Sequence, residues 1–401
     1  MKYNHPTEIP RSKALFFDWV ADRISSPKAK SGDTHPITWG ADGDIYVGAG
    51  DPGWYLDNGA LRYIDWTNDG WKGDDELVNR TVGAVFDKIT GEPEEFEVHR
   101  VNDMYGFTGG GGSGAKPSGL ISVGGKLYYA LHNLLGMKKS RFRSCQHGSD
   151  ATIICSEDYG KTWTPELNDM LIRFNAEHYD WSIINNKTKP EQRESFEGWK
   201  PMFPGNLFGG LSFVQFGKDN ADAVDEYVYA VSADQWDNGR DIRLGRVRND
   251  SIMDRSAWEF YVGAGWTKKL EESKPILEID RHISMPEMVY IKSMQKYITL
   301  TWAFHTDFRT HTGSELTILE SDNPWGPFEL VHYEWMWHDR KVCPYVARMP
   351  LKWFNPETRE GYILFSGNFE AANSHYGPHL QKFKFSDRTG DEWPWSYDVV
   401  M

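Results

Sequence analysis

The stretch GDTHPITWGADGDIYVGAGD, residues 32–51, contains two short apolar segments separated by an Ala-Asp-Gly turn. β-Branched and aromatic residues fill both segments, and Asp and Gly are the residues that hairpin turns favour. The stretch therefore predicts a β-hairpin. An aspartate stands at the open end of each arm, Asp33 on the first and Asp51 on the second.

The same kind of hairpin recurs along the chain. Four later segments repeat the pattern of two strand-like arms joined by a turn. They are SGLISVGGKLYYALHN at 118–133, LSFVQF at 211–216 with DEYVYAVSAD at 225–234, EMVYIKSMQKYITLTWAF at 287–304, and ARMPLKWF at 347–354 with EGYILFSGNF at 360–369. Each hairpin is followed by a second, more polar pair of strand-like segments.

Recurring units of four short strands, without helical periodicity, are typical of a β-propeller. The five hairpins predict an all-β fold, a single five-bladed β-propeller domain that spans residues 1–401. A sixth unit within 170–205 is the alternative. The N-terminal segment ALFFDWVADRI, residues 14–24, is expected to supply an outer strand that helps to close the ring.

One acidic motif has a structural explanation. SEDYGKTW, residues 156–163, fits the Asp-box pattern S-x-D-x-G-x-x-W, in which the carboxylate shapes a turn and the Trp packs beneath it. Asp158 is therefore expected to be a structural residue on the outer rim. SDNPWGPFELV, residues 321–331, predicts the same kind of turn in another blade.

Composition and charge exclude several classes of function. A net charge of −14 disfavours nucleic acid, because phosphate binding needs clusters of Lys and Arg. No apolar run approaches the ~20 residues of a membrane span, so no membrane insertion is expected. The first residues contain no apolar core of a signal peptide, and the localisation stays open. Three cysteines form no disulfide framework, although Cys145 and Cys155 have the option of pairing.

The sequence indicates neither a metal nor a cofactor. The glycine run at 109–114 lacks the G-K-[ST] of a phosphate-binding loop. His375 and His379 have a metal-ligand spacing, but Gly377 and Pro378 between them argue against a helix. A structural cation in the central channel stays an alternative.

The turn of the first hairpin decides how its two aspartates meet. A three-residue loop at 41–43, with Gly43 left-handed, places Asp33 directly opposite Asp51, with Cβ atoms ~4.5–5.5 Å apart. A two-residue turn would shift the register and separate their faces. Carboxylates held this close differ in pKa, so one acts as an acid while the other stays ionised. A separation of ~5–5.5 Å favours a retaining glycosidase, for which we expect Asp33 as nucleophile and Asp51 as acid/base.

The pattern G-D-x-x-P-x-T-W-x-x-D-G-x-x-Y-x-x-x-G-D of residues 32–51 resembles the opening motif of glycoside hydrolase family 183, endo-D-arabinanases once grouped as a domain of unknown function. Further matches follow in order, and the most specific are those at 209–234 and 242–263. The resemblance implies a five-bladed propeller that cleaves D-arabinofuranosyl linkages internally, as in arabinogalactan and lipoarabinomannan. It also maps the acid pair onto Asp33 and Asp51. The segments 335–345 and 368–380 are richer in His and aromatic residues than the family pattern.

Other candidates lie where inner strands of the predicted blades begin or end. We expect six residues to bind the polysaccharide substrate: Trp54, Lys116, His132, Trp302, His305 and Asn368. Lys116 is also placed to contact the acid pair. Weaker candidates are His282, Asp339, Tyr376 and the rival carboxylate Glu287.

Two other functions fit the same pattern. A polysaccharide lyase would use a His or Tyr as base, with Lys116 neutralising a uronate. A non-catalytic glycan-binding propeller would use the aromatic residues alone. The products separate the three functions, because a hydrolase makes a reducing end, a lyase makes a double bond, and a binding protein makes neither.

Overall fold

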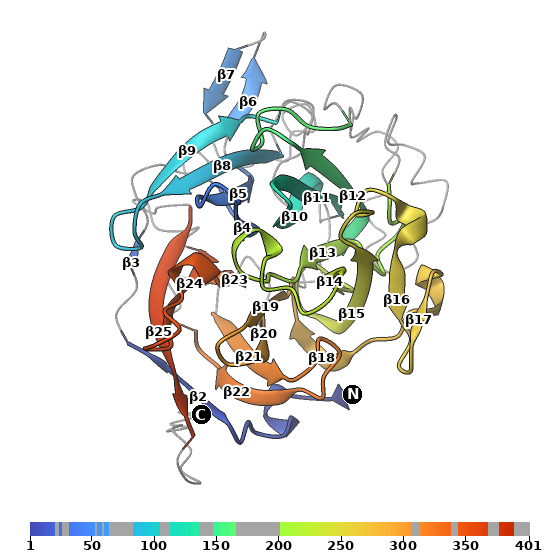
Figure 1. The fold of residues 1–401 in the computed structure, drawn as a ribbon, viewed down its shortest axis with the longest axis vertical. Coiled ribbons are helices and arrows are strands. Elements are labelled where there is room, and N and C mark those ends of the chain that lie inside the picture. Colours follow the sequence, from blue (N-terminus) through green and yellow to red (C-terminus); the bar gives the residue numbers. More distant parts are fainter. Residues whose placement is uncertain are drawn as a thin grey trace.

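The computed structural model describes residues 1–20, 24–25, 32–52, 54–57, 60–63, 83–104, 113–135, 147–165, 201–305, 313–337, 344–367 and 377–388. In these residues the chain is built from β-strands with a few short 3-10 turns. Five sheets of three or more strands surround a common centre in a propeller-like arrangement (Figure 1). The predicted all-β, propeller-like fold is confirmed.

The first two sheets come from the N-terminal half of the chain. The first orders β4 (Ile37–Trp39), β5 (Ile45–Gly50), β8 (Ala84–Thr90) and β9 (Glu97–Asn102). The second orders β10 (Ser113–Val123), β11 (Lys126–Leu135) and β12 (His147–Ser156). A separate hairpin pairs β6 (Trp54–Asp57) with β7 (Ala60–Tyr63).

The other three sheets follow in chain order. The third is built on β13 (Gly210–Phe213), β14 (Tyr227–Ala233) and β15 (Gly239–Arg248), extended by β16 (Glu259–Tyr261), β17 (Trp266–Thr267), β18 (Leu277–Ile283) and β1 (Lys2–Tyr3). The fourth orders β19 (Glu287–Ile291), β20 (Lys296–Phe304), β21 (Ser314–Ser321) and β22 (Glu329–Glu334). The fifth orders β23 (Tyr345–Arg348), β24 (Glu360–Ser366), β25 (His379–Asp387) and β2 (Leu15–Trp19), with β3 (Ile24–Ser25) also on β25.

All five predicted hairpins are antiparallel pairs: β4 with β5, β10 with β11, β13 with β14, β19 with β20, and β23 with β24. Figure 1 shows the first strand of each pair nearest the centre. Four of the five sheets have at least four strands, but the sheet of β10, β11 and β12 has three. The count of five full blades is therefore not reached in the described residues. Two isolated bridges extend the edge of β12 there, Cys155 with Thr164 and Ala151 with Phe203, and most of 170–205 lies outside the described residues.

The N-terminal segment joins the ring where the chain ends. β2 pairs antiparallel with β25, and Leu15 lies opposite Asp387 (Figure 1). The outer strand predicted in 14–24 is confirmed. The same segment also crosses to two other sheets, because β1 pairs with β18 and the Ser12 N–H donates to the Leu330 carbonyl at 2.9 Å. Residues 1–19 thus tie together the third, fourth and fifth sheets.

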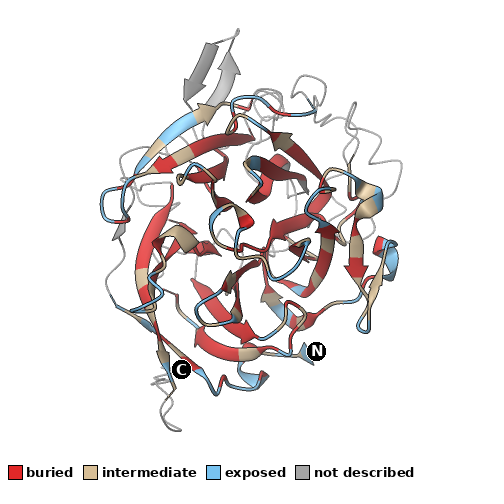
Figure 2. Cartoon of the chain, in the orientation of Figure 1, coloured by how far each residue is buried: buried red, intermediate tan, exposed pale blue. Residues whose placement is uncertain are grey.

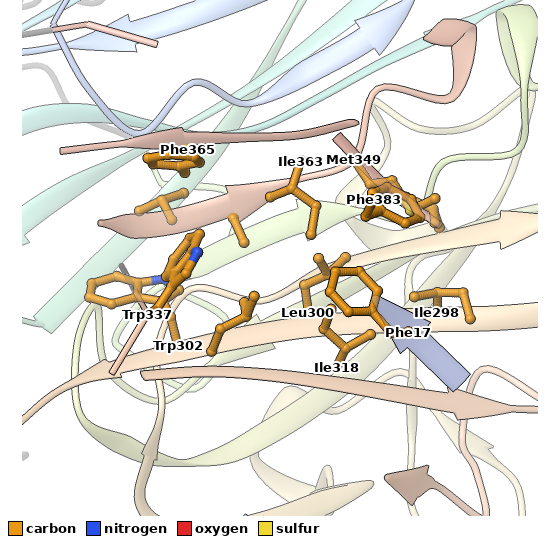
Figure 3. Close-up of a cluster of buried hydrophobic side chains, with 14 of the residues drawn as sticks. Phe17, Ile298, Leu300, Trp302, Ile318, Trp337, Met349, Ile363, Phe365 and Phe383 are labelled. Atoms are coloured by element: carbon orange, nitrogen blue, oxygen red, sulfur yellow. The ribbon is translucent and has the colours of Figure 1, made fainter. Parts of the chain in front are cut away.

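Apolar side chains fill the space between the sheets. Figure 2 shows that the inner strands are mostly buried, whereas the connecting turns and parts of outer strands such as β9 are exposed. Figure 3 shows the cluster between the fourth and fifth sheets, where Trp302, Trp337 and Phe365 pack together. Most large aromatic rings of the described residues are therefore core residues.

The predicted Asp box is present. The Thr162 N–H and hydroxyl donate to the Asp158 carboxylate at 2.9 and 2.7 Å, and Trp163 is buried beneath the turn. Burial opposes ionisation of Asp158, but these hydrogen bonds outweigh it and lower the pKa of the carboxyl. Asp158 is a structural residue. Cys155 is a free thiol, and Cys145 and Cys343 lie outside the described residues.

Candidate active site

The first hairpin has the predicted three-residue loop. Ile37 lies opposite Val47 and Trp39 opposite Ile45, and the Gly40 N–H donates to the Asp44 carbonyl at 2.8 Å. Gly43 closes the loop with a φ of 95°. This left-handed conformation is accessible to glycine without a steric penalty, which is why the loop ends there.

The register changes before the hairpin reaches its aspartates. Asp33 bridges to Gly50 rather than to Asp51. Thr34 and His35 have φ angles of 64° and 33°, and they form a bulge in which two residues face the single residue Ala49. The predicted direct opposition of Asp33 and Asp51 is therefore wrong by one residue. The spacing argument for a retaining enzyme is lost with it.

Asp33 and Asp51 remain neighbours in spite of the bulge. Asp33 and Gly50 exchange two backbone hydrogen bonds of 2.8 Å, and Asp51 follows Gly50 directly. The side chain of Asp33 lies over Gly50, where an added Cβ would stand 2.7 Å from Oδ1 of Asp33. Asp33 is 6% exposed and Asp51 is 9% exposed. Two nearly buried aspartates thus follow each other closely along the open end of the hairpin.

Asp51 has a cationic partner. The ammonium group of Lys116, from β10, forms an ion pair with Oδ1 of Asp51, and both side chains are buried. An ammonium group in contact with a carboxylate stabilises its ionised form. Lys116 therefore contacts the acid pair, one of the two roles expected for it.

Asp33 has a neutral partner from the opposite end of the chain. The hydroxyl of Tyr345, the first residue of β23, donates to Oδ2 of Asp33 at 2.8 Å. The Tyr345 ring is fixed by Trp302 and Trp236, with ring centroids 5.7 and 5.9 Å away. Trp302, which was expected to bind substrate, is fully buried in this core and does not present a ring to a ligand (Figure 3). It packs against the ring of Tyr345 instead.

Arg348, three residues further on, joins all five sheets beneath the acid pair. Its buried guanidinium donates to the carbonyls of Thr34 and Ser118, to Oγ of Ser212 and to Oε2 of Glu287. These partners precede β4 or lie on β10, β13 and β19, and Arg348 itself is on β23.

Glu287, the rival carboxylate, is the acidic partner of this arginine. The Arg348 Nη1 to Glu287 Oε2 distance is 2.7 Å, and both side chains are buried. Burial raises the pKa of Glu287, and the charge of Arg348 opposes that effect. The pair is a structural link between the fourth and fifth sheets.

Strained backbone gathers around the two aspartates. Four non-glycine residues have positive φ angles here: Thr34 at 64°, His35 at 33°, Asp51 at 45° and Val346 at 51°. Such a conformation is rare for any residue and an outlier for a β-branched one such as Val346. Residues of this kind persist only when their surroundings hold them, and they concentrate at functional sites.

Two buried histidines complete the surroundings. His132 lies opposite Lys116, and its Nδ1–H donates to the Gly209 carbonyl at 2.7 Å. Burial lowers the pKa of His132 to about 4, against the effect of that hydrogen bond, and nearby Lys116 lowers it further. Burial, with the nearby His379 and Arg348, lowers the pKa of His35 to about 3. Both rings are therefore neutral near pH 7, and His132 is fully buried in its position opposite Lys116.

The remaining predicted residues are spread more widely. His305 follows β20 and stacks on Trp335. Trp54 begins β6, but its side chain is outside the described part, as is Asn368. Among the weaker candidates, Asp339 and Tyr376 are also outside it, and His282 pairs with Glu315 at 2.5 Å.

Three residues of the site were missed in the sequence: Gly50, Tyr345 and Arg348. A positional signal for one of them was present. Lys116, Glu287 and Tyr345 each lie near the beginning of the innermost strand of a sheet, as Asp33 does. The recurring segment at 347–354 begins two residues after Tyr345, so Tyr345 was not counted as part of that inner strand.

The described residues also limit two kinds of site. They contain no group of three or more His, Cys, Asp or Glu side chains placed to hold a metal ion. None of their helices is long and apolar enough to cross a membrane.

Solved structures with a similar chain path include three carbohydrate-related or putative hydrolases. An α-L-arabinofuranosidase from Podospora anserina in complex with cellotriose has a TM-score of 0.45 at 9% identity, over 94% of this chain and 98% of that chain. A putative hydrolase from Bacteroides ovatus has 0.47 at 13%, over 92% and 90%. A xylan β-1,4-xylosidase from Bacillus halodurans has 0.46 at 11%, over 92% and 55%. Likeness at this level does not bear on the reaction.

Sequence comparison gives the family. No curated protein matches the chain. Residues 83–330 match the family described as "Domain of unknown function (DUF4185)", a match that begins after Asp33 and Asp51 and covers more than half of the sequence. The chain belongs to the DUF4185 family.

Proposed function

We propose that this protein is an endo-acting glycoside hydrolase that cleaves D-arabinofuranosyl linkages in D-arabinan of the arabinogalactan and lipoarabinomannan type. One observation carries the proposal: Asp33 and Asp51 are nearly buried neighbours with different partners, one a tyrosine hydroxyl and the other an ammonium group. Glycoside hydrolysis needs two carboxyl groups in unlike protonation states. The strained backbone around them supports a functional site rather than a solvated loop.

The partners divide the roles. Lys116 keeps Asp51 ionised, so Asp51 attacks the anomeric carbon or activates the water that does so. Asp33 accepts a hydrogen bond from the Tyr345 hydroxyl and lies beside Asp51, and we assign it the role of the general acid that protonates the leaving oxygen. This assignment is the reverse of the one expected from the sequence, which placed Lys116 near the acid pair but did not show that it pairs with Asp51.

The substrate rests on the sequence resemblance. Residues 32–51 resemble the opening motif of the endo-D-arabinanases of glycoside hydrolase family 183, and the segments at 209–234 and 242–263 extend the resemblance. We also propose that the ring is one five-bladed domain. In it, the sheet of β10, β11 and β12 is the second blade, and its outer strand begins at the bridge between Cys155 and Thr164.

Digestion of purified D-arabinan tests the proposal. We expect new reducing ends and a ladder of oligosaccharides, and loss of turnover by several orders of magnitude in Asp33→Asn and Asp51→Asn with nearly unchanged melting temperatures. Free arabinose as the sole product contradicts endo cleavage. An ultraviolet-absorbing unsaturated product from a uronate polymer indicates a lyase, and binding without any product indicates a glycan-binding propeller.

Two rescue experiments test the division of roles. Azide should restore turnover to Asp51→Ala, because a small anion replaces a missing nucleophile or base, and should leave Asp33→Ala inactive. Conversely, Asp33→Ala should keep activity on an aryl arabino-oligosaccharide whose leaving group needs no protonation. The opposite pattern returns the roles to those expected from the sequence.

A further inference from the structure

Trp335 is the exposed aromatic residue of the described part of the chain. It is 51% exposed, and the other large apolar side chains exposed to a similar degree there are Met1, Val20 and Val224, none of which is aromatic. Most aromatic rings of the described residues are buried, so an indole exposed in this way calls for an explanation.

The Trp335 ring is held in a fixed plane. It stacks on the imidazole of His305, with ring centroids 3.6 Å apart and an interplanar angle of 13°. Stacking covers one face of the indole, and the exposed area leaves the ring accessible to a ligand. A ring oriented in advance binds a flat partner with little loss of side-chain entropy.

Trp335 lies on the same side of the ring of sheets as the acid pair. His305 follows β20, just as Asp51 follows β5, and both strands are the second in their sheets. Trp335 follows β22, which runs parallel to β20 because each is antiparallel to β21.

The stacked pair is also connected to Asp33 through packed side chains. Phe304, the residue before His305, has its ring centroid 6.0 Å from that of Tyr345. Tyr345 in turn donates to Asp33. The stacked pair is therefore separated from the acid pair by the fifth sheet, whose Tyr345 contacts both Phe304 and Asp33.

We propose that Trp335, backed by His305, is a stacking platform for a furanose ring of the same neutral glycan, remote from the bond that is cleaved. The C–H groups of a sugar face pack on the negative face of an aromatic ring. A net charge of −14 disfavours a nucleobase of a polyanion, and a single exposed ring is too small for a protein or lipid surface. This inference rests on the proposed function for the identity of the glycan.

The platform predicts an effect that depends on chain length. Binding energy from a distant part of a substrate helps only a substrate long enough to reach it. Trp335→Ala should leave the affinity for the shortest D-arabino-oligosaccharides unchanged and should weaken that for long ones by about 10-fold, typical of one lost stacking contact. His305→Ala should give a smaller loss with the same length dependence, because it frees the ring without removing it.

Calorimetric titration of a series of D-arabino-oligosaccharides into the Asp33→Asn background measures this without cleavage. Val224→Ala, which trims another exposed apolar side chain, is the matched control and should change nothing. In addition, long oligosaccharides should shift the tryptophan fluorescence of the parent protein and should shift that of Trp335→Ala less.

The outcomes for the platform and for the proposed function are separate. Length-dependent binding that Trp335→Ala weakens supports the platform even where the parent protein cleaves nothing. Equal affinities of the parent and Trp335→Ala at every length overturn it, even if the protein cleaves D-arabinan. An equal loss at all lengths, or no binding of any length by the parent protein, also overturns it.

Discussion

The hydroxyl of Tyr345 donates to Oδ2 of Asp33 at 2.8 Å, although 312 positions separate the two residues in the chain. The same C-terminal sheet supplies Ser366, whose Oγ accepts from the Thr34 N–H at 3.0 Å. The segment that carries Asp33 is therefore positioned by the sheet that ends the chain. The contacts that join the last sheet to the first therefore also position Asp33.

Tyr345→Phe should separate the hydrogen bond from the packing. The ring keeps its contacts with Trp302 and Trp236, and Asp33 loses a donor. We expect kcat to fall ~10- to 100-fold, within the range of one misplaced acid or base, with KM little changed. Because a donated hydrogen bond stabilises the ionised carboxylate, its loss should move the alkaline limb of the pH–rate profile to higher pH.

Tyr229→Phe is the matched control for Tyr345→Phe. The Tyr229 hydroxyl donates to Asp225 at 2.6 Å, away from the acid pair, so its removal should leave kcat and the pH profile unchanged. A Tyr345→Phe variant that behaves like this control would mean that Tyr345 is only a packing residue.

Gly50→Ala should lower kcat, because the added methyl group displaces the Asp33 carboxyl. An added Cβ at Gly50 would stand 2.7 Å from Oδ1 of Asp33 and 3.3 Å from Pro117, so the Asp33 carboxyl must move. A shift of this size in a catalytic group costs ~10²-fold in kcat. Gly210→Ala is the control, because the nearest atom to its Cβ is 3.9 Å away, on His132. If both variants were equally active, Asp33 would have no part in the reaction.

The hairpins were predictable and the site was only partly so. The turn chemistry of residues 41–43 gave the correct register of β4 and β5, because a three-residue loop with a terminal glycine is a local feature. The bulge at Thr34 and His35 depends on Ser366, which is far away in sequence. No local pattern contains that information, so Asp33 and Asp51 were identified as neighbours with the wrong alignment.

Buried and exposed aromatic residues were not distinguished for a similar reason. Trp302 and His305 both lie at the end of a predicted inner strand, which made both of them candidates. Strand alternation says which side of a sheet a residue is on, but the packing of the next sheet decides whether that side is closed. Trp302 lies in the closed space beside Tyr345, whereas His305 lies beneath exposed Trp335.

Arg348 and Glu287 should behave as a coupled pair. Arg348→Met leaves Glu287 buried without its cation, and breaking a buried pair in this way costs about 3–5 kcal/mol of unfolding free energy. Adding Glu287→Gln should recover part of the loss, because the uncompensated charge disappears. Urea unfolding of the two single variants and the double variant gives the coupling energy. Additive losses would show that the contacts of Arg348 with Thr34, Ser118 and Ser212 dominate.

The stability of the protein should fall in mild acid because of His35 and His132. Folding lowers the pKa of His35 to about 3 and that of His132 to about 4, both by burial, from an ordinary value near 6.5. Below pH ~6.5 the unfolded chain therefore binds two protons that the folded chain does not, and the unfolding free energy decreases as the pH falls. Well below that pH each histidine contributes a slope of ~1.4 kcal/mol per pH unit.

Urea unfolding between pH 6 and pH 5 measures this slope in a range where few carboxyl groups titrate. The amide of His132→Asn can still donate to the Gly209 carbonyl. This variant should reduce the slope of unfolding free energy against pH by ~1.4 kcal/mol per pH unit, the contribution of one proton. His35→Asn should do the same, and the double variant should lose both contributions. Slopes unchanged from the parent protein would mean that these rings take up protons in the folded state, which contradicts their neutral, buried role beside the acid pair.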